Sequence, residues 1–381
     1  MKQACFNQKG LLRALEAHSA PIEWVAGGAV NSASDASASI LFLGDTVLSG
    51  NVGRLIEQYG ITYPFAKCPG GFFDATAVCW NLECCVSERG SRAANKVIAF
   101  RARPRSLGAL QVSRAVQVLN HANNHFLDFG ADAAMDTLRL ARERGMVSFG
   151  VAPASLNSGA IVETAAGAIG LLGLAPCARP LAEPAPINLE SSSVSRMARR
   201  VQELRPLVDV LVVSLHQGVE YCSYPLRTAR RACHAAVDAG ADCVIGHHAH
   251  LLQGIEVYRG VPIFHNIGGF LCGELDRMRH PQCAVSCAVR VHISACQVVR
   301  VALQFVSLND NWQPVPLAGE LHRRVALRVR DLSVILERPI RAYATAQLAQ
   351  VRRIQARVLP GREARRCEEA AVRGRRFLRP D

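Results

Sequence analysis

The feature that most constrains this chain is a series of short apolar runs, each ending in a polar side chain. The longest run extends from Val208 to Leu215 and ends at His216. A second, from Asp242 to Ile245, leads through Gly246 into three histidines within four residues. Buried parallel strands read as nearly continuous apolar runs, and open α/β sheets bind ligands beyond the carboxyl ends of their strands. The pattern predicts an α/β protein with its site at such an edge.

The histidine cluster has a spacing that suits metal binding. His248 and His250 are two residues apart, so on an extended backbone their rings leave on the same side, roughly 6–7 Å apart at Cα. The two imidazoles would then face one metal or two adjacent metals. The alternative interpretation is a polar loop that is rich in histidine.

Three earlier runs end in the same way. Residues 40–43 lead into Asp45, residues 75–82 into Glu83, and residues 115–119 into a polar cluster that contains Asn124, His125 and Asp128. Asp45 taken alone is equally compatible with a helix cap or a turn. Carboxylate, amide and imidazole ligands at several strand ends suit a pair of divalent transition metals such as Mn, Fe or Zn.

Periodicity and turn residues predict the remaining elements. Helical spacing favours helices, and alternation favours strands. We expect helices at 11–17, 131–144 and 225–239, a hairpin at 161–176, a loop at 178–195, a strand at 261–270 and an antiparallel pair at 289–306; residues 26–39 are typical of a linker.

Composition restricts the class of protein. Half of the residues are hydrophobic and 20% are charged, which is typical of a globular chain. No apolar run reaches the ~18 residues of a membrane span, and the first ten residues lack the apolar core of a secretory signal, so we expect a cytoplasmic protein. The 14 cysteines contain no Cys-x-x-Cys pair. They predict small core residues in a reducing compartment and no disulfide framework.

The formal net charge of +13 is concentrated in arginines near the C-terminus, from Arg323 to Arg376. This excess favours anionic partners; the alternative is a solvated helical face without a partner. Aromatic residues make up only 6%, so stacking platforms for nucleic acid are lacking and we expect no nucleic-acid partner. We expect the tail to tune attraction to an anionic substrate or surface.

Taken together, the strand-end blocks resemble the signature of a known family. The blocks are Gly-Asp45, Asn-Leu-Glu83, Asn-Asn124-His125-x-x-Asp128-x-Gly130, Leu-His216-x-Gly218-x-Glu220-Tyr221 and Gly246-His-His-x-His250. In this order they are similar to the poly-γ-glutamate/capsule biosynthesis (CapA) family, over roughly residues 38–310. That family resembles the calcineurin-like metallophosphoesterases, which implies an α/β fold: a four-layer α/β sandwich. The expected organisation is an N-terminal extension or linker (1–39), this domain (40–320) and a basic, helical C-terminal tail (321–381).

The resemblance also implies roles for individual residues. The implied metal ligands are Asp45, Glu83, Asn124, His216, His248 and His250. His125 would be the nearby acid and Asp128 its orienting group, whereas Glu220 would hold a histidine or contact substrate. The implied function is a metal-dependent hydrolase or transferase in poly-γ-glutamate or capsule-type biosynthesis, acting on a phosphate ester, an acyl phosphate or a γ-glutamyl amide. The alternative is a non-catalytic accessory subunit of a biosynthetic complex that binds an anionic polymer.

Three positions depart from the family pattern. Thr46-Val47 follows Gly-Asp45, so the Asp-x-His opening of ordinary phosphoesterases is absent. Gln217 replaces the usual Trp after the strand-end histidine, and Gly268-Gly269-Phe270 replaces a Gly-Asn-Phe block. We expect weaker binding of one metal and a change in one polar contact of the pocket.

Overall fold

The structure is a computed structural model of the whole chain. It describes residues 5–17, 20–27, 37–94, 96–153, 159–176, 187–189, 194–271, 280–338, 343 and 349–350. Much of the predicted linker, most of the predicted loop at 178–195 and nearly all of the arginine-rich segment beyond 338 lie outside these residues.

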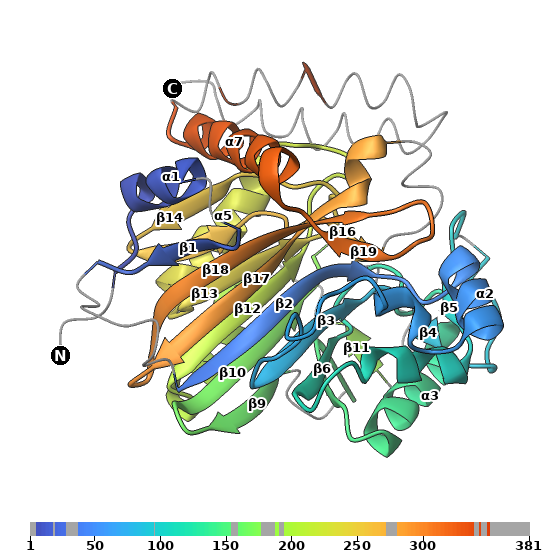
Figure 1. Cartoon of the computed structure of the whole chain (residues 1–381). Coiled ribbons are helices and arrows are strands. Elements are labelled where there is room, and N and C mark those ends of the chain that lie inside the picture. Colours follow the sequence, from blue (N-terminus) through green and yellow to red (C-terminus); the bar gives the residue numbers. More distant parts are fainter. Residues whose placement is uncertain are drawn as a thin grey trace.

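The first sheet has nine strands, and its centre is parallel (Figure 1). Its order is β1-β18-β17-β2-β3-β6-β7, with β16 beside β2 and β19 beside β18. The neighbours β2, β3, β6 and β7 are parallel, whereas β17 and β18 form the expected antiparallel pair. The strands are β1 (Ile22–Val25), β2 (Ala38–Thr46), β3 (Ala77–Leu82), β6 (Val116–Asn120), β7 (Val147–Phe149), β16 (Gly269–Leu271), β17 (Val285–Ser294), β18 (Gln297–Leu308) and β19 (Pro314–Pro316).

The second sheet has six strands in the order β14-β15-β13-β12-β10-β9. Its four central strands are parallel and each edge strand is antiparallel to its neighbour. The strands are β9 (Gly159–Thr164), β10 (Gly167–Leu174), β12 (Val210–His216), β13 (Cys243–His247), β14 (Ile255–Tyr258) and β15 (Val261–Phe264). Two small sheets pair β4 (Cys85–Val86) with β5 (Arg101–Ala102) and β8 (Val151–Pro153) with β11 (Ile187–Leu189).

The helices cover the outer faces of the two sheets and one end of the molecule. They are α1 (Gln8–Glu16), α2 (Gly50–Tyr59), α3 (Gly130–Glu143), α4 (Val194–Leu204), α5 (Arg227–Asp238) and α7 (Gly319–Leu336), with short 3₁₀ turns η1 (Tyr63–Phe65), η2 (Pro104–Leu110), η3 (Arg205–Leu207) and η4 (Pro281–Ala284). Figure 1 shows α1 and α7 side by side, and Arg330 of α7 forms an ion pair with Glu16 of α1.

Alternation along the strands creates the layers, because successive side chains of a strand point to opposite faces. In β2, Ile40 and Phe42 belong to the core between the sheets, whereas Leu41 and Leu43 pack with α2 and α3. The outer face of the second sheet packs in the same way against α4 and α5. The predicted four-layer α/β sandwich is confirmed.

Two local predictions were wrong. The single strand expected at 261–270 is two strands in different sheets, β15 and β16, because the chain turns at Gly268 (φ +79°), whose carbonyl accepts a hydrogen bond from Asp45. Within the predicted loop at 178–195, residues 187–189 form β11, which pairs with β8.

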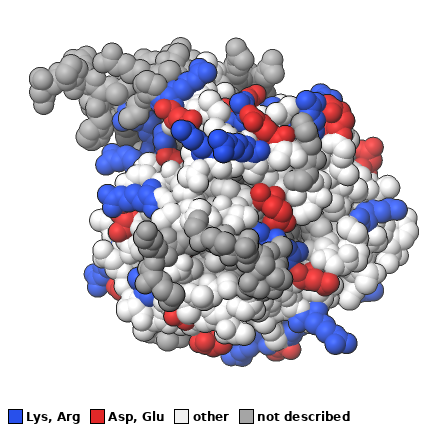
Figure 2. Space-filling view, turned by 60° about the vertical axis from the view of Figure 1, so that its left-hand side comes forward, with Lys and Arg blue, Asp and Glu red and all other residues white. Residues whose placement is uncertain are grey.

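The described surface carries charged residues of both signs. In the view of Figure 2, Lys and Arg form separate groups with Asp and Glu between them. None of the helices in the described residues has the length and apolarity needed to cross a bilayer. The described cysteines are free thiols, as expected.

Candidate metal centre

The carboxyl ends of strands from both sheets meet at one buried cluster. Asp45 lies in β2 and Glu83 directly follows β3, both in the first sheet. His216 ends β12, and His248 and His250 follow β13, in the second. None of these five side chains is more than 8% exposed. Two sheets that face each other thus bring residues more than 200 positions apart into contact.

Close approaches of the backbone allow this convergence. A Cβ on Gly44 would lie 1.9 Å from the Gly268 carbonyl oxygen, and one on Gly246 would lie 1.9 Å from that of His265. Each glycine comes just before strand-end residues of the cluster. Only a residue without a side chain fits where two backbones approach so closely.

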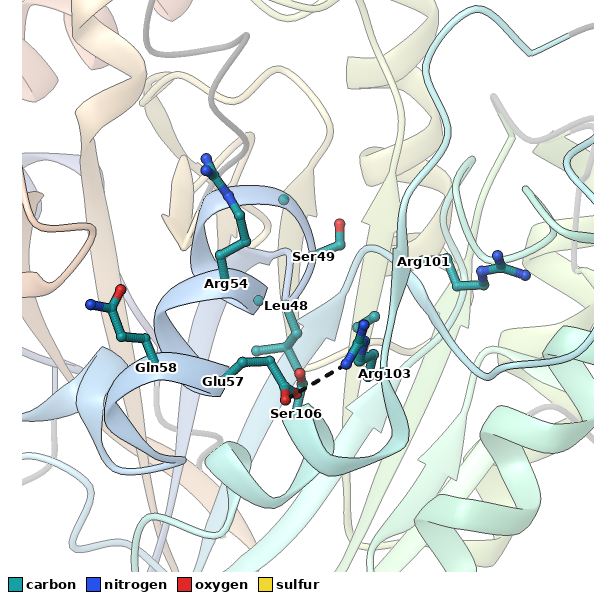
Figure 3. A pocket seen from close by; sticks show the side chains of 11 residues that line it. Leu48, Ser49, Arg54, Glu57, Gln58, Arg101, Arg103 and Ser106 are labelled. Atoms are coloured by element: carbon teal, nitrogen blue, oxygen red, sulfur yellow. Dashed lines mark ion pairs between the residues drawn. The ribbon is translucent and has the colours of Figure 1, made fainter.

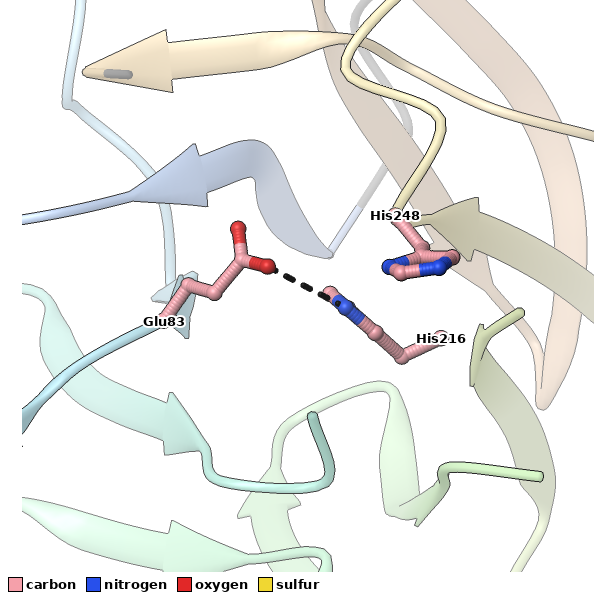
Figure 4. A group of neighbouring side chains, drawn as sticks. All are labelled: Glu83, His216 and His248. Carbon is pink, nitrogen blue, oxygen red and sulfur yellow. Dashed lines mark ion pairs between the residues drawn. The ribbon is translucent and has the colours of Figure 1, made fainter. Parts of the chain in front are cut away.

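The five side chains form two groups that share one carboxylate. Glu83, His216 and His248 form the first, and Asp45, Glu83 and His250 form the second; within each group the donor atoms lie within 4.8 Å of one another. Figure 4 shows the Glu83 carboxylate facing the His216 ring, with the ring of His248 beside it. The Glu83 Oε1 to His216 Nε2 distance is 3.2 Å. The arrangement has two adjacent positions, each with three donors.

The backbone at the histidines is not extended, contrary to our expectation. β13 ends at His247, and both His248 (φ +93°) and His250 (φ +56°) have left-handed conformations. Non-glycine residues in this region store strain, which occurs most often at functional sites. With this backbone conformation the two rings lie 6.2 Å apart between centroids and belong to different donor groups.

The polar cluster after β6 lies against the first group. The side-chain oxygen of Asn124 is 2.8 Å from His216 Nε2, which puts the amide beside the first group. His125 is in neither group; its Nδ1 lies 2.7 Å from Asp128 Oδ2. Asp128 is fully buried and also accepts a hydrogen bond from the backbone N–H of Phe100. The His125–Asp128 contact fixes the orientation of the imidazole.

Glu220 lies on the loop that follows His216. It is half-buried in the loop after β12 and belongs to neither group of donors. Gln217, at the position of the family's usual Trp, donates to the Ala229 carbonyl of α5. Asn266 accepts a hydrogen bond from the Gly268 N–H, so it shapes the turn before β16.

Sequence reasoning missed three residues of the cluster. Asn81 donates to Asp45 (2.7 Å) and lies 3.2 Å from His216 Nδ1, so one amide contacts both sheets. His247 Nδ1 is 3.6 Å from Asp45. Lys96 forms a 2.7 Å ion pair with Asp128 and donates to the Asn124 carbonyl. The position of Asn81, two residues before Glu83 and on the same side of a strand, could have indicated its place in the cluster. Lys96 lies in an irregular segment, where no sequence pattern indicates such a role.

Burial favours the neutral forms of His216 and His248. Burial and then the neighbouring His250 lower the pKa of His248 to about 3. Burial and then His248 likewise hold the pKa of His216 well below its usual value. Burial opposes ionisation of Asp45, but hydrogen bonds with His247 and His250 outweigh it and hold the pKa of Asp45 well below its usual value. Neutral imidazoles beside ionised carboxylates are the protonation states that metal ligands need.

The donor set fits a pair of divalent transition metals. Nitrogen and carboxylate oxygen donors suit Mn, Fe or Zn, and the nearby cysteines belong to the apolar core. The Nδ1 atom of His248 is buried without a hydrogen-bond partner among the described residues. A buried polar atom left in this way costs free energy unless a ligand satisfies it.

Comparisons with known proteins agree with the motif resemblance. The chain is 29% identical over 248 residues to the PGA biosynthesis protein CapA of Bacillus subtilis, which covers 64% of this chain and 65% of that protein. It is 30% identical over 217 residues to a probable polyglutamine synthesis accessory protein of Mycobacterium tuberculosis, covering 51% of this chain and 55% of that one. The chain therefore spans somewhat over half of the length of these curated relatives.

One solved structure, described as a novel phosphatase from Mycoplasma pneumoniae, is 12% identical with a TM-score of 0.44 and covers 76% of this chain and 97% of that one. A family model described as bacterial capsule synthesis protein PGA_cap matches residues 39–274, more than half of the chain and every candidate ligand above. This chain belongs to the bacterial capsule synthesis protein PGA_cap family.

Proposed function

We propose that the chain is a metal-dependent hydrolase or transferase of capsule-type or poly-γ-glutamate synthesis, acting on a phosphate ester, an acyl phosphate or a γ-glutamyl amide. The observation that carries the proposal is the pair of three-donor groups that share the buried Glu83. A purely structural cluster would satisfy its buried members by hydrogen bonds, whereas His248 Nδ1 has no such partner among the described residues.

The first metal position would be held by Glu83, Asn124, His216 and His248, and the second by Asp45, Glu83 and His250. When bound, a divalent metal pair supplies Lewis-acid polarisation of a phosphoryl or carbonyl oxygen and lowers the pKa of water. Asn81 orients Asp45 and His216 through its amide. The surrounding apolar core excludes bulk water and strengthens the electrostatic interactions inside.

His125 is proposed as the general acid. With Nδ1 held by Asp128, its Nε2 is left to carry a proton to the leaving oxygen. Lys96 forms an ion pair with the other oxygen of Asp128 and so keeps the carboxylate in place. The ring of Phe100, 4.5 Å from that of His125 between centroids, limits the rotation of the imidazole.

A second candidate is an accessory subunit that binds an anionic polymer without turnover. The Mycobacterium tuberculosis relative, which is described as a probable polyglutamine synthesis accessory protein, favours it. The two candidates differ in the need for metal, since a polymer-binding subunit needs no buried set of metal donors.

The test is elemental analysis of metal-loaded protein together with a panel of phosphatase and peptidase substrates. We expect one to two transition-metal ions per chain, and loss of at least one in the variant His248→Ala/His250→Ala. The matched control, His234→Ala/His292→Ala, removes two histidines outside the centre and should keep the metal. Wild type that binds no metal would refute the enzyme proposal and favour the accessory subunit.

A further inference from the structure

A pocket of about 630 Å³ lies between the start of α2, strand β5 and the turn η2 (Figure 3). None of the residues that line it is a candidate metal ligand. Its walls include Leu48 and Ala102, and no aromatic side chain lines it. The volume is that of a typical small-molecule site, but the pocket offers no ring on which a base could stack.

The charged side chains of the lining are three arginines and one acid. They are Arg54, Arg101, Arg103 and Glu57. Arg54 is exposed and forms no ion pair within the described residues. Arg103 faces Glu57 at 3.8 Å, but its side chain is 73% exposed, and such an open pair contributes little to stability. Two guanidinium groups are therefore available to a ligand at low cost.

Arg101 has a different part in the pocket. Its guanidinium donates to the carbonyls of Arg89 and Gly90 and lies over the ring of Phe129. These contacts hold its positive charge beside Phe129. Figure 3 shows the Arg101 side chain extending away from the other labelled residues, whereas Ser49 lies between Arg54 and Arg103.

Two uncharged features also point to an anion. The hydroxyl-bearing residue Ser106 lines the pocket, is only 1% exposed and makes no side-chain hydrogen bond with the described residues. The first turn of α2 contains no acidic residue, and Ser49 makes no side-chain capping bond. The N–H groups of a first helical turn carry partial positive charge and lack partners within the helix.

We propose that this pocket binds an oxyanionic group, a carboxylate or a phosphate, at a site separate from the metal centre. Guanidinium groups, a hydroxyl donor and helix N–H groups are the partners that such oxygens prefer. The site adjoins the metal centre along the chain: Leu48 follows Asp45 by three positions, and Arg101 of β5 pairs with Cys85, two positions after Glu83. Residues beyond the carboxyl ends of β2 and β3 thus contribute both to the pocket and to the centre.

The experiment is calorimetric titration at low salt with two probes, inorganic phosphate and a hexaglutamate peptide. The pocket variant is Arg54→Gln/Arg103→Gln. The matched control, Arg231→Gln/Arg324→Gln, removes two exposed helical arginines that form no ion pair in the described part of the chain. We expect at least a tenfold loss of affinity for one probe in the pocket variant and less than a twofold loss in the control. Glu57→Gln, which removes the acid of the lining, should strengthen binding.

The probe that binds identifies the source of the oxyanion. The proposal would be overturned by an equal loss of probe affinity in the two double variants or by no loss in either. It would also be overturned if the wild-type protein bound neither probe. Because Arg54 is exposed and unpaired, Arg54→Gln alone serves as a second variant that keeps the fold. Protein from which a chelator has removed the metal must still bind the probe, because the proposed site is separate from the metal centre. Binding that disappears with His248→Ala/His250→Ala would move the anion to the metal centre, whereas absence of metal alone refutes only the enzyme proposal.

Discussion

At the scale of a residue, Asn81 shows how a side chain outside the two donor groups can orient the members of both groups. Its amide contacts Asp45 and His216, and its carbonyl oxygen accepts a hydrogen bond from Asn120. The orientation of candidate ligands from two sheets therefore depends on one buried side chain.

We predict that Asn81→Leu, which keeps the branched shape but removes the amide, weakens metal binding by about 10–100-fold, the usual effect of losing a partner of a ligand. Gln117→Leu is the control, because Gln117 bonds Trp80 in the same sheet and should leave affinity unchanged. Metal titration of the two variants measures the difference. Equal affinity would show that Asn81 is only a packing residue.

A substitution at His125 tests the proposed chemistry separately from metal binding. We predict that His125→Ala keeps metal content and melting temperature but lowers turnover by ~10²–10⁴-fold, because a general acid contributes about that much. Elemental analysis and the substrate panel measure both properties on one preparation. If the variant loses metal and keeps its activity, His125 is a ligand instead.

At the scale of an element, β13 shows why glycine precedes the histidines. The strand lies beside β15, and the His265 carbonyl occupies the space that a Cβ at Gly246 would need. Moving either strand to make room would shift the histidines that follow.

We therefore predict that Gly246→Ala costs about 1–3 kcal/mol in the free energy of unfolding, as overpacking does, and also lowers metal content. Gly70→Ala is the control, because no atom lies within 4 Å of its added Cβ. Denaturant unfolding and elemental analysis compare the two. A Gly246→Ala protein as stable as Gly70→Ala would contradict the close packing of β13 on β15.

At the scale of the whole molecule, burial links stability to pH. His121 is fully buried, its Nε2 lies 3.0 Å from the Ser148 hydroxyl, and burial lowers its pKa to about 3. In the unfolded chain the pKa of histidine is about 6.5. Because the folded-state pKa is the lower one, the unfolded state binds the extra proton. The stability associated with neutral His121 is present above about pH 6.5 and is lost as pH falls towards 3.

We predict that His121→Gln, which cannot be protonated and can still bond Ser148, makes the unfolding free energy less sensitive to pH. Between pH 6 and 4 the slope should decrease by about 1.4 kcal/mol per pH unit, the value for one proton. Denaturant unfolding across this range measures it. Identical slopes for wild type and variant would mean that His121 titrates alike in both states.

The sequence alone determined the main buried strands, the polar residues at their ends and the family, since these depend on local patterns. Buried strands read as apolar runs, and the ends of β2, β3, β12 and β13 lie at or within two residues of Asp45, Glu83, His216 and the histidine cluster. The helices at 8–16, 130–143 and 227–238 likewise follow from their apolar spacing. α7 covers the start of the basic helical tail expected from residue 321, and nearly all of that tail beyond 338 lies outside the described residues.

Only the tertiary structure decided which residues face one another. β2 pairs with β17, about 250 positions further along, and β1 at the N-terminus pairs with β18, pairings that no local pattern specifies. The sharing of Glu83 by two donor groups, the ion pair of Lys96 with Asp128 and the arginine-lined pocket likewise join residues from separate elements, which local patterns do not specify. Local sequence sets the period and the end of each strand, whereas the packing of the two sheets on a common core sets the distances between strand ends.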